Sequence, residues 1–388
     1  MTTTSKGADR QSVEKLLVEL VGIPSVNPSL DGGSGEAGLA DAVAAQLTVI
    51  GVPPTRQAVQ EGRGNVVARL EGAPGTPVVV FEAHMDTVVL SGDAQARALR
   101  RGTRIHGRGA CDTKGAIVAM LEALRLLRGR QHATVLFAAT IDEEYGCLGV
   151  KRLVRDDHGI DLAVVGEPTQ LRTAIAHKGV LRFRIRTEGT PAHGSRPELG
   201  ANAIYGMGPV LDLLQTEVIP QLRRVTHPLL GSPSLSVTTI RGGAAENIIP
   251  DRCSIGIDRR VNPGEDVEAW LSELDQALAA LRVAGIEIVR EEPWYRIAPL
   301  DTPPDHRLPR AMQDARREIL GLDDTPIGVT YGSDASVLVE AGVPTIVFGP
   351  GSIAQAHGDD EWVEIEDVAR AAEVLAELAV RLASGRDL

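Results

Sequence analysis

Side chains that bind metal ions or carry protons follow several predicted strands of this chain, at the point where each strand ends. These side chains are His84, Asp86, Glu143, Glu144, Glu167 and His357. The preceding segments are continuous apolar runs such as PVVVFEA at 77–83 and TVLFAAT at 134–140, which are typical of strands buried on both faces. Because ligand sites in parallel α/β sheets lie outside the carboxyl ends of the strands, we expect these side chains to meet at one edge of a sheet.

Asp112 adds a further carboxylate to this set. It lies in the segment GRGACDTKG, whose glycines permit a tight loop ahead of a helix. Imidazole and carboxylate ligands together suit divalent zinc, cobalt or manganese. A bridging carboxylate allows two such ions to lie about 3.5 to 4 Å apart. The residue types therefore predict a two-metal site.

Two pairs of neighbours in this set can divide the work. The spacing His84-x-Asp86 allows Asp86 to fix the tautomer of the imidazole. Glu143 and Glu144 are adjacent in a predicted loop, so that one can bind metal while the other acts as a base.

Each residue also has an ordinary structural explanation. A single histidine after a strand usually makes a hydrogen bond in a loop, and acids such as Asp112 or Glu143 and Glu144 often stabilise the N-terminus of a helix. The glycine-rich segment is no phosphate loop, since it lacks GxxxxGK[ST]. The concurrence of five metal-type residues at strand ends or loops favours the metal site.

Length and composition exclude several other classes of protein. The 388 residues predict two or three domains. Acidic residues number 52 against 40 basic ones, a net charge of −12, and only four Phe, three Trp and four Tyr are present, which disfavours nucleic-acid binding. The three cysteines fit neither a disulfide framework nor a CxxC clip, and no signal peptide or membrane span is readable. We therefore expect a cytoplasmic enzyme or small-molecule binder.

The order of predicted elements specifies an α/β fold. The predicted helices are 12–22, 36–50, 115–127, 145–155 and 365–382, and the predicted strands are 65–70, 77–83, 134–140, 162–165 and 344–351. Alternation of strands and helices predicts a mostly parallel, helix-covered sheet.

Between these segments the strands alternate apolar and polar residues, as strands with one exposed face do. The predicted order is strand 180–187, helix 201–214, strands 234–241 and 252–261, helix 266–281 and strand 287–290. This is a split βαββαβ, ferredoxin-like arrangement. We therefore predict a catalytic domain formed by 1–178 and 293–388, with an α+β domain inserted at 179–292.

Five groups of motifs resemble, in order, those of the M20 family of di-zinc amidohydrolases and exopeptidases. They are HMDTV at 84–88, GRG and DTKG within 107–115, DEE at 142–144, GEPT at 166–169 and QAH at 355–357. Within the family, the chain most resembles the acetylornithine deacetylase and succinyl-diaminopimelate desuccinylase branch. The match runs from about residue 12 to the C-terminus.

The resemblance implies a role for each residue of the set. Asp112 would bridge two Zn²⁺ ions, for which Co²⁺ or Mn²⁺ can substitute. His84 and Glu167 would bind one ion, and Glu144 and His357 the other. Glu143 would be the general base, with Asp86 orienting His84.

The resemblance also implies that the inserted domain is a lid and dimerisation domain. His193, in GTPAHGSRPELGANAI, would reach the active site of the partner subunit of a homodimer and polarise the scissile carbonyl. Asn247 and Arg260 match substrate-binding positions, with Arg260 gripping a substrate carboxylate. Gly332 and Ser333 lie in a pocket-lining stretch that matches neither branch member cleanly, and we count them as substrate-binding.

The function implied is hydrolysis of the amide bond of an N-acyl amino acid by metal-activated water. Alternatives are a metallo-carboxypeptidase or dipeptidase of the same family, and an aminohydrolase acting on a nonpeptide C–N bond. A non-catalytic relative would have lost a ligand or the base, and this chain keeps all of them. The acyl group and the amino acid stay open.

Overall fold

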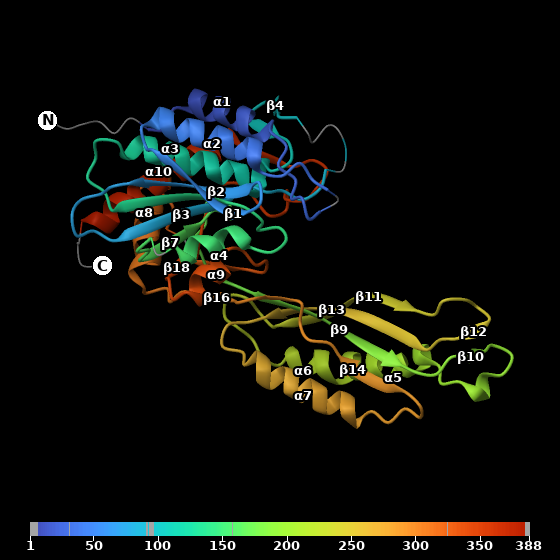
Figure 1. The fold of residues 1–388 in the computed structure, drawn as a ribbon. Coiled ribbons are helices and arrows are strands. Elements are labelled where there is room, and N and C mark those ends of the chain that lie inside the picture. The colour runs from blue at the N-terminus through green and yellow to red at the C-terminus, as the bar shows by residue number, and fades with distance from the viewer. Residues whose placement is uncertain are drawn as a thin grey trace. The chain divides into compact units, whose positions relative to one another are not determined.

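The computed structural model describes residues 7–30, 32–90, 92, 97–156, 158–323 and 325–384. The chain divides into two compact units (Figure 1). The first unit comprises Met1–Ile175, Thr302–Ile327 and Ser333–Leu388, and the second comprises Ala176–Asp301 and Gly328–Gly332. The predicted insertion at 179–292 falls inside the range of the second unit. That these parts fold as independent domains stays a prediction.

The main sheet of the described chain has nine strands. Their order is β1 (Pro54–Gln60), β2 (Arg63–Leu70), β6 (Thr134–Thr140), β3 (Val78–His84), β7 (Leu162–Val165), β18 (Thr345–Val347), β8 (Ala174–His177) and β16 (Leu300–Asp301), with β17 (Ile327–Val329) paired to β8. Strands β6, β3, β7 and β18 are parallel neighbours, whereas β1, β2 and β8 pair antiparallel with the strands beside them.

The prediction of an α/β fold is confirmed, and the sheet is mixed, with its parallel strands in the centre. The sequence-based prediction missed β1, which is only partly buried and pairs with β2 as an antiparallel hairpin. Antiparallel strands can be joined by a tight turn without a crossover helix, and here the turn includes Gly62 at φ 69°. The strand–helix alternation therefore describes only the central strands.

Helices cover both faces of this sheet (Figure 1). On one face α1 (Arg10–Val21), α2 (Ala37–Ile50), α3 (Gly115–Leu127) and α10 (Ile365–Ala383) pack together, while α4 (Leu148–Arg155) and α9 (Ala335–Glu340) lie on the other. Helix α3 is buried almost throughout and forms the centre of the core with α10. Burying each large apolar side chain contributes roughly 1.5 to 3 kcal/mol.

Helix α8 (Arg307–Leu320) packs against α10 and is absent from the prediction. Its buried apolar residues, Leu308, Ala311, Met312 and Ala315, recur at helical spacing. The periodic signal was therefore present in the sequence, although arginine and other polar residues fill the positions between.

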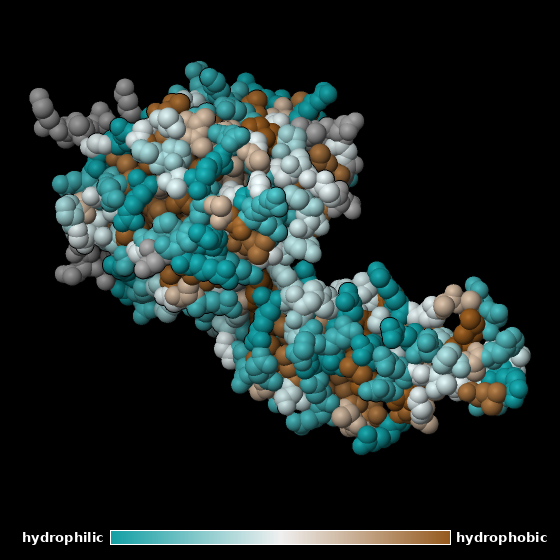
Figure 2. All heavy atoms as spheres, in the orientation of Figure 1, coloured by the Kyte–Doolittle hydropathy of each residue, from teal (hydrophilic) through white to brown (hydrophobic). Residues whose placement is uncertain are grey.

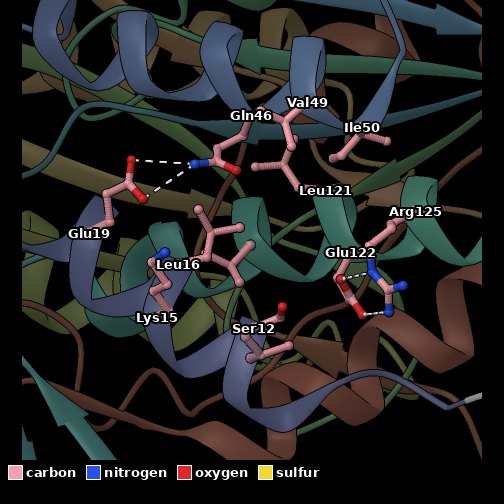
Figure 3. A pocket seen from close by; sticks show the side chains of 12 residues that line it. Ser12, Lys15, Leu16, Glu19, Gln46, Val49, Ile50, Leu121, Glu122 and Arg125 are labelled. Carbon is pink, nitrogen blue, oxygen red and sulfur yellow. Dashed lines mark hydrogen bonds and ion pairs between the residues drawn. The ribbon is translucent and has the colours of Figure 1, made fainter.

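A hollow of about 230 Å³ lies among α1, α2 and α3 (Figure 3). Within it Gln46 donates to Glu19, and Glu122 pairs with Arg125. None of the predicted metal ligands lines it. The hollow is therefore separate from the predicted site.

A small antiparallel sheet adjoins the start of the glycine-rich segment. It consists of β19 (Trp362–Glu364), β5 (Arg104–His106) and β4 (Leu99–Arg101). Strand β5 leads directly into GRGACDTKG, and α3 follows it. Both ends of the segment are therefore attached to regular structure.

The main strands and helices of the second unit follow the predicted order, and the short elements β10 (Ala192–His193), α6 (Ile219–Leu222) and β12 (Ile248–Ile249) are additional to it. The main elements are β9 (Gly179–Glu188), α5 (Ala203–Leu213), β11 (Ser234–Gly242), β13 (Arg252–Val261), α7 (Val267–Ala280) and β14 (Glu287–Arg290). The sheet order is β11-β13-β9-β14, all antiparallel, with β15 (Tyr295–Ile297) also paired to β9. Leu181, Phe183 and Ile185 of β9 alternate inward and form a separate core with α5 and α7.

The visible surface is predominantly hydrophilic, with apolar residues interspersed (Figure 2). Within the described residues, no helix is both long and apolar enough to span a bilayer.

Candidate metal centre

The parallel strands deliver the predicted residues to one edge of the sheet. Strand β3 ends at His84, β6 runs into the turn that carries Glu143 and Glu144, and Glu167 follows β7. His357 lies on the loop between β18 and β19. Because β6, β3, β7 and β18 are parallel neighbours, their carboxyl ends point the same way.

Asp112 lies between the two histidines. Nε2 of His84 is 3.1 Å from Oδ1 of Asp112, and Nε2 of His357 is 3.2 Å from Oδ2. Glu167 Oε1 lies 3.7 Å from the His84 nitrogen, and Glu144 Oε1 lies 3.1 Å from the His357 nitrogen. In each of the two groups, the donor atoms lie within 4.8 Å of one another. One carboxylate thus faces two separate histidine–carboxylate groups.

The charge state of these residues fits divalent cations. Burial raises the pKa of Glu167 well above its usual value, and neighbouring Asp112 raises it further. Burial alone would lower the pKa of His84, yet the nearby carboxylates of Asp112 and Asp86 raise it well above 6.5. The buried carboxylates therefore favour positive charge beside them, and bound cations would supply it without protons.

His84 is oriented by the backbone of Asp86. Its Nδ1 lies 2.9 Å from the Asp86 carbonyl oxygen and 3.6 Å from the carboxylate Oδ1. Because a carbonyl only accepts, Nδ1 carries a hydrogen, and Nε2 becomes the metal-binding nitrogen once it loses its proton. The Asp86 carboxylate instead accepts the backbone N–H groups of Glu143 and Glu144, each at 3.0 Å.

The sequence-based prediction missed the residues that form hydrogen bonds with Asp86 and with the neighbouring Asp142. The Asn27 amide donates to Asp86 Oδ2 at 2.7 Å and to Asp142 Oδ1 at 3.1 Å. Arg63 also donates to Asp142, at 3.2 Å. These residues belong to the loop after α1 and to β2, so that no local spacing connects them with the site.

Glu143 is half-buried, and burial raises its pKa well above the usual range, with Glu144 adding to the rise. A carboxyl with a raised pKa suits proton transfer near neutral pH. Glu143 also forms a third group with Cys147 and Asp334. Burial raises the pKa of the Cys147 thiol well above 9, which keeps the thiol protonated in the metal-free protein.

The predicted substrate residues of the second unit lie at two places. His193, in β10 (Ala192–His193), is exposed, and its Nδ1 contacts the Ser195 hydroxyl at 2.7 Å. Asn247 lies beside it, since its carbonyl accepts the Gly194 N–H at 2.7 Å, and β10 pairs with β12 (Ile248–Ile249). Arg260 lies eight residues beyond the start of β13, roughly 26 Å along the strand.

Gly332 and Ser333 occupy tightly packed positions. A Cβ atom on Gly332 would lie 2.3 Å from Cδ1 of Ile297, so that a side chain there would displace the end of the Ile297 side chain. Ser333 is fully buried, and its hydroxyl accepts the Ala335 N–H at 3.3 Å at the start of α9. Their role in substrate binding stays a prediction.

Known proteins resemble this chain along most of its length. Residues 80–381 match the model of peptidase family M20/M25/M40. An acetylornithine deacetylase from Myxococcus xanthus is 32% identical over 363 residues, which cover 90% of this chain and 93% of that protein.

Two solved peptidase structures share the fold. A tripeptidase from Staphylococcus aureus has a TM-score of 0.80 at 20% identity, and an aminopeptidase from Bacillus cereus has 0.78 at 21%. Each alignment covers 97% of this chain and 100% of the solved one. From the family match and the deacetylase similarity, we conclude that the chain is a hydrolase belonging to peptidase family M20/M25/M40.

Proposed function

We propose that this protein is a di-zinc enzyme that hydrolyses the amide bond of an N-acyl amino acid. The observation that carries the proposal is the placement of Asp112, whose two oxygens face His84 with Glu167 on one side and His357 with Glu144 on the other. Similarity to an acetylornithine deacetylase supports the choice of an acyl amino acid as substrate.

The five ligands would hold two metal ions, which when bound lower the pKa of a water molecule and polarise the scissile carbonyl. Glu143 takes the proton of the attacking water and later delivers it to the leaving amine. The C–N bond breaks, and the products are a carboxylate and a free amino acid. Asp86 holds Glu143 in place through the backbone contact at 3.0 Å.

Substrate would be bound by Asn247, Arg260, Gly332 and Ser333, with the Arg260 guanidinium pairing with a carboxylate. His193 would polarise the carbonyl. Because His193 and Arg260 lie near opposite ends of β13, one chain cannot place both on a single small substrate. Since Asn247 lies beside His193, this separation supports a homodimer in which each active site receives His193 and Asn247 of the partner subunit.

We also propose a cytoplasmic location. The three cysteines, Cys111, Cys147 and Cys253, are free and buried, as expected in a reducing compartment. Cell fractionation with an antibody would test this, and recovery outside the cytoplasm would contradict it.

A substrate panel on zinc-reconstituted protein tests the proposed reaction. The panel contains acetyl, succinyl, formyl and carbamoyl amino acids together with dipeptides, and kcat/KM is measured before chelation, after it and after zinc is restored. We expect an acyl amino acid to give the highest kcat/KM, chelation to abolish turnover, and zinc to restore it. A preference for dipeptides would favour a peptidase, and turnover that survives metal removal would refute the mechanism.

A further inference from the structure

Glu361 is a buried carboxylate that has no role in the site described above. It lies four residues after His357 and is 2% exposed. One oxygen, Oε1, accepts the backbone N–H groups of Cys111 at 3.0 Å and of Asp112 at 3.1 Å. The other, Oε2, accepts from Arg108 Nη1 at 2.7 Å. A single side chain thus contacts the glycine-rich segment both near its start, at Arg108, and in its middle, at Cys111 and Asp112.

The backbone that Glu361 contacts is irregular. Within Ala110–Lys114, Asp112 has φ −123° and ψ 88°, and Thr113 has φ −132° and ψ 26°, both outside the helical region. Regular helical hydrogen bonds therefore do not define the position of Asp112. An acceptor from outside the segment, the Glu361 carboxylate, binds its N–H instead.

Glu361 is itself held by regular structure. Its backbone carbonyl accepts the Gly107 N–H at 3.0 Å. The three residues after it form β19, which pairs with β5, with Trp362 opposite His106. Its carboxylate is therefore fixed relative to the strand that enters the segment, and Arg108, only 4% exposed, balances its charge.

The position of Asp112 matters for both histidine–carboxylate groups at once. Its Oδ1 lies near His84 and its Oδ2 near His357. A shift of its backbone would displace both oxygens together, whereas loss of His357 would affect one group only. A residue that fixes this backbone acts on both metal ions.

From these contacts we propose that Glu361 is a positioning residue that holds Asp112 in the orientation needed to bind both metal ions. The inference rests on the proposed di-metal function. Residues that orient metal ligands typically change metal affinity by about 10- to 100-fold when they are replaced.

The test compares replacements of Glu361 that keep different properties. Glu361→Ala removes both acceptor oxygens. Glu361→Gln keeps one acceptor oxygen at the same reach for the two backbone N–H groups, but it loses the charge and the acceptor for Arg108. Glu361→Asp keeps the charge but is one methylene shorter. The control is Glu364→Ala, because Glu364 also accepts from an arginine, Arg104, at 2.6 Å, while its other described hydrogen bond comes from Thr103. Zinc affinity and stoichiometry are measured by chelator competition, together with the Co²⁺ absorption spectrum and the Tm of metal-free protein.

We expect Glu361→Ala to weaken both zinc sites by about 10- to 100-fold and to change the Co²⁺ spectrum. Glu361→Gln should bind zinc more tightly than Glu361→Asp, because acceptor position matters more than charge, and Glu364→Ala should match wild type in zinc affinity. If Glu361→Ala does not fold, the zinc affinities of Glu361→Gln and Glu361→Asp still test the inference.

Wild-type zinc affinity in folded Glu361→Ala, or tighter binding by Glu361→Asp than by Glu361→Gln, would overturn the inference while leaving the proposed function intact. A wild-type protein that binds no zinc would refute the proposed function, and this inference with it.

Discussion

At the scale of single residues, the proposed mechanism assigns different tasks to two adjacent acids, Glu143 and Glu144. Glu144 lies beside His357, while Glu143 has no part in either of the two histidine–carboxylate groups. Both are held by the Asp86 carboxylate through their backbone N–H groups. Because the anchoring is through the backbone, either side chain can be replaced without releasing the turn.

Replacing the proposed base therefore separates chemistry from metal binding. We expect Glu143→Ala to lower kcat/KM by about 10²- to 10⁴-fold, the usual contribution of a general base, while two zinc ions stay bound. Metal analysis and kinetics on the best substrate of the panel measure this. Glu144→Ala is the matched control and should lose zinc. Turnover retained in Glu143→Ala would contradict the assignment.

Zinc binding should release protons. Hydrogen bonds to Asp112 and Glu144 raise the pKa of His357 to about 10 in the metal-free protein. Below that pH the imidazole must lose its proton to bind zinc, so that apparent affinity should rise with pH up to about 10. Conversely, the protonated imidazole stabilises the metal-free fold fully below pH 6.5, and this stability is lost as the pH rises through about 10.

Titration calorimetry in buffers of different ionisation enthalpy measures the released protons. His357→Ala should release fewer protons than wild type on binding its remaining ion. Equal release by the two proteins would contradict this assignment.

At the scale of elements, close packing between α4 and the end of β6 positions the turn that carries Glu143. Gly149 of α4 lies against this strand end, where an added Cβ would lie 2.4 Å from the Ile141 nitrogen and 2.5 Å from its oxygen. The helix approaches this closely only because residue 149 has no side chain.

Two helical glycines give a matched pair of variants. We expect Gly149→Ala to lower the free energy of unfolding by about 1 to 3 kcal/mol, the usual cost of overpacking, and to reduce kcat. Gly38→Ala in α2, where a Cβ would make only an ordinary contact, 3.4 Å from Cγ2 of Ile23, should raise the free energy of unfolding by about 0.5 to 1 kcal/mol. Denaturant unfolding measures the free energy of unfolding of each variant, and steady-state kinetics measure kcat. A Gly149→Ala variant with the wild-type free energy of unfolding would contradict the packing argument.

At the scale of the whole molecule, part of the net charge of −12 comes from carboxylates of the predicted metal site. The predicted ligands Asp112, Glu144 and Glu167 concentrate negative charge at one sheet edge, beside Glu143. Bound divalent cations would offset part of it. Metal should therefore stabilise the folded chain and also activate it.

Removal of metal should lower the Tm, and zinc should restore it. A ligand at 100 times its Kd stabilises the native state by about 2.7 kcal/mol per site. Scanning calorimetry after chelation and after zinc addition measures the shift. Mg²⁺, which prefers oxygen ligands, is the control and should restore little. A Tm that is the same with and without zinc would contradict the metal site.

Mixed dimers test whether two chains share an active site. Glu143→Ala and His193→Ala should each be inactive alone. When their subunits are exchanged, sites that combine an intact Glu143 with His193 of the partner subunit should recover activity. If His193 acts within its own chain, mixing restores nothing, and sedimentation of the mixture confirms whether dimers form.

The sequence by itself determined the residue types of the site and most of the elements that carry them. Helix α3 and strands β6, β7, β13 and β14 have the predicted bounds, and the α/β fold and the family are confirmed. These features are readable because apolar periodicity and polar residues at strand ends are local properties of a chain.

Only the tertiary structure decided how these residues are held. Asn27 reaches Asp86 across 59 residues, and Glu361 reaches the Asp112 N–H across 249. The tertiary structure also places a backbone carbonyl beside His84, and it directs the two oxygens of Asp112 toward different histidine–carboxylate groups. Such contacts join segments that meet only when strands and helices pack, and no spacing along the chain encodes which buried acceptor will face which donor.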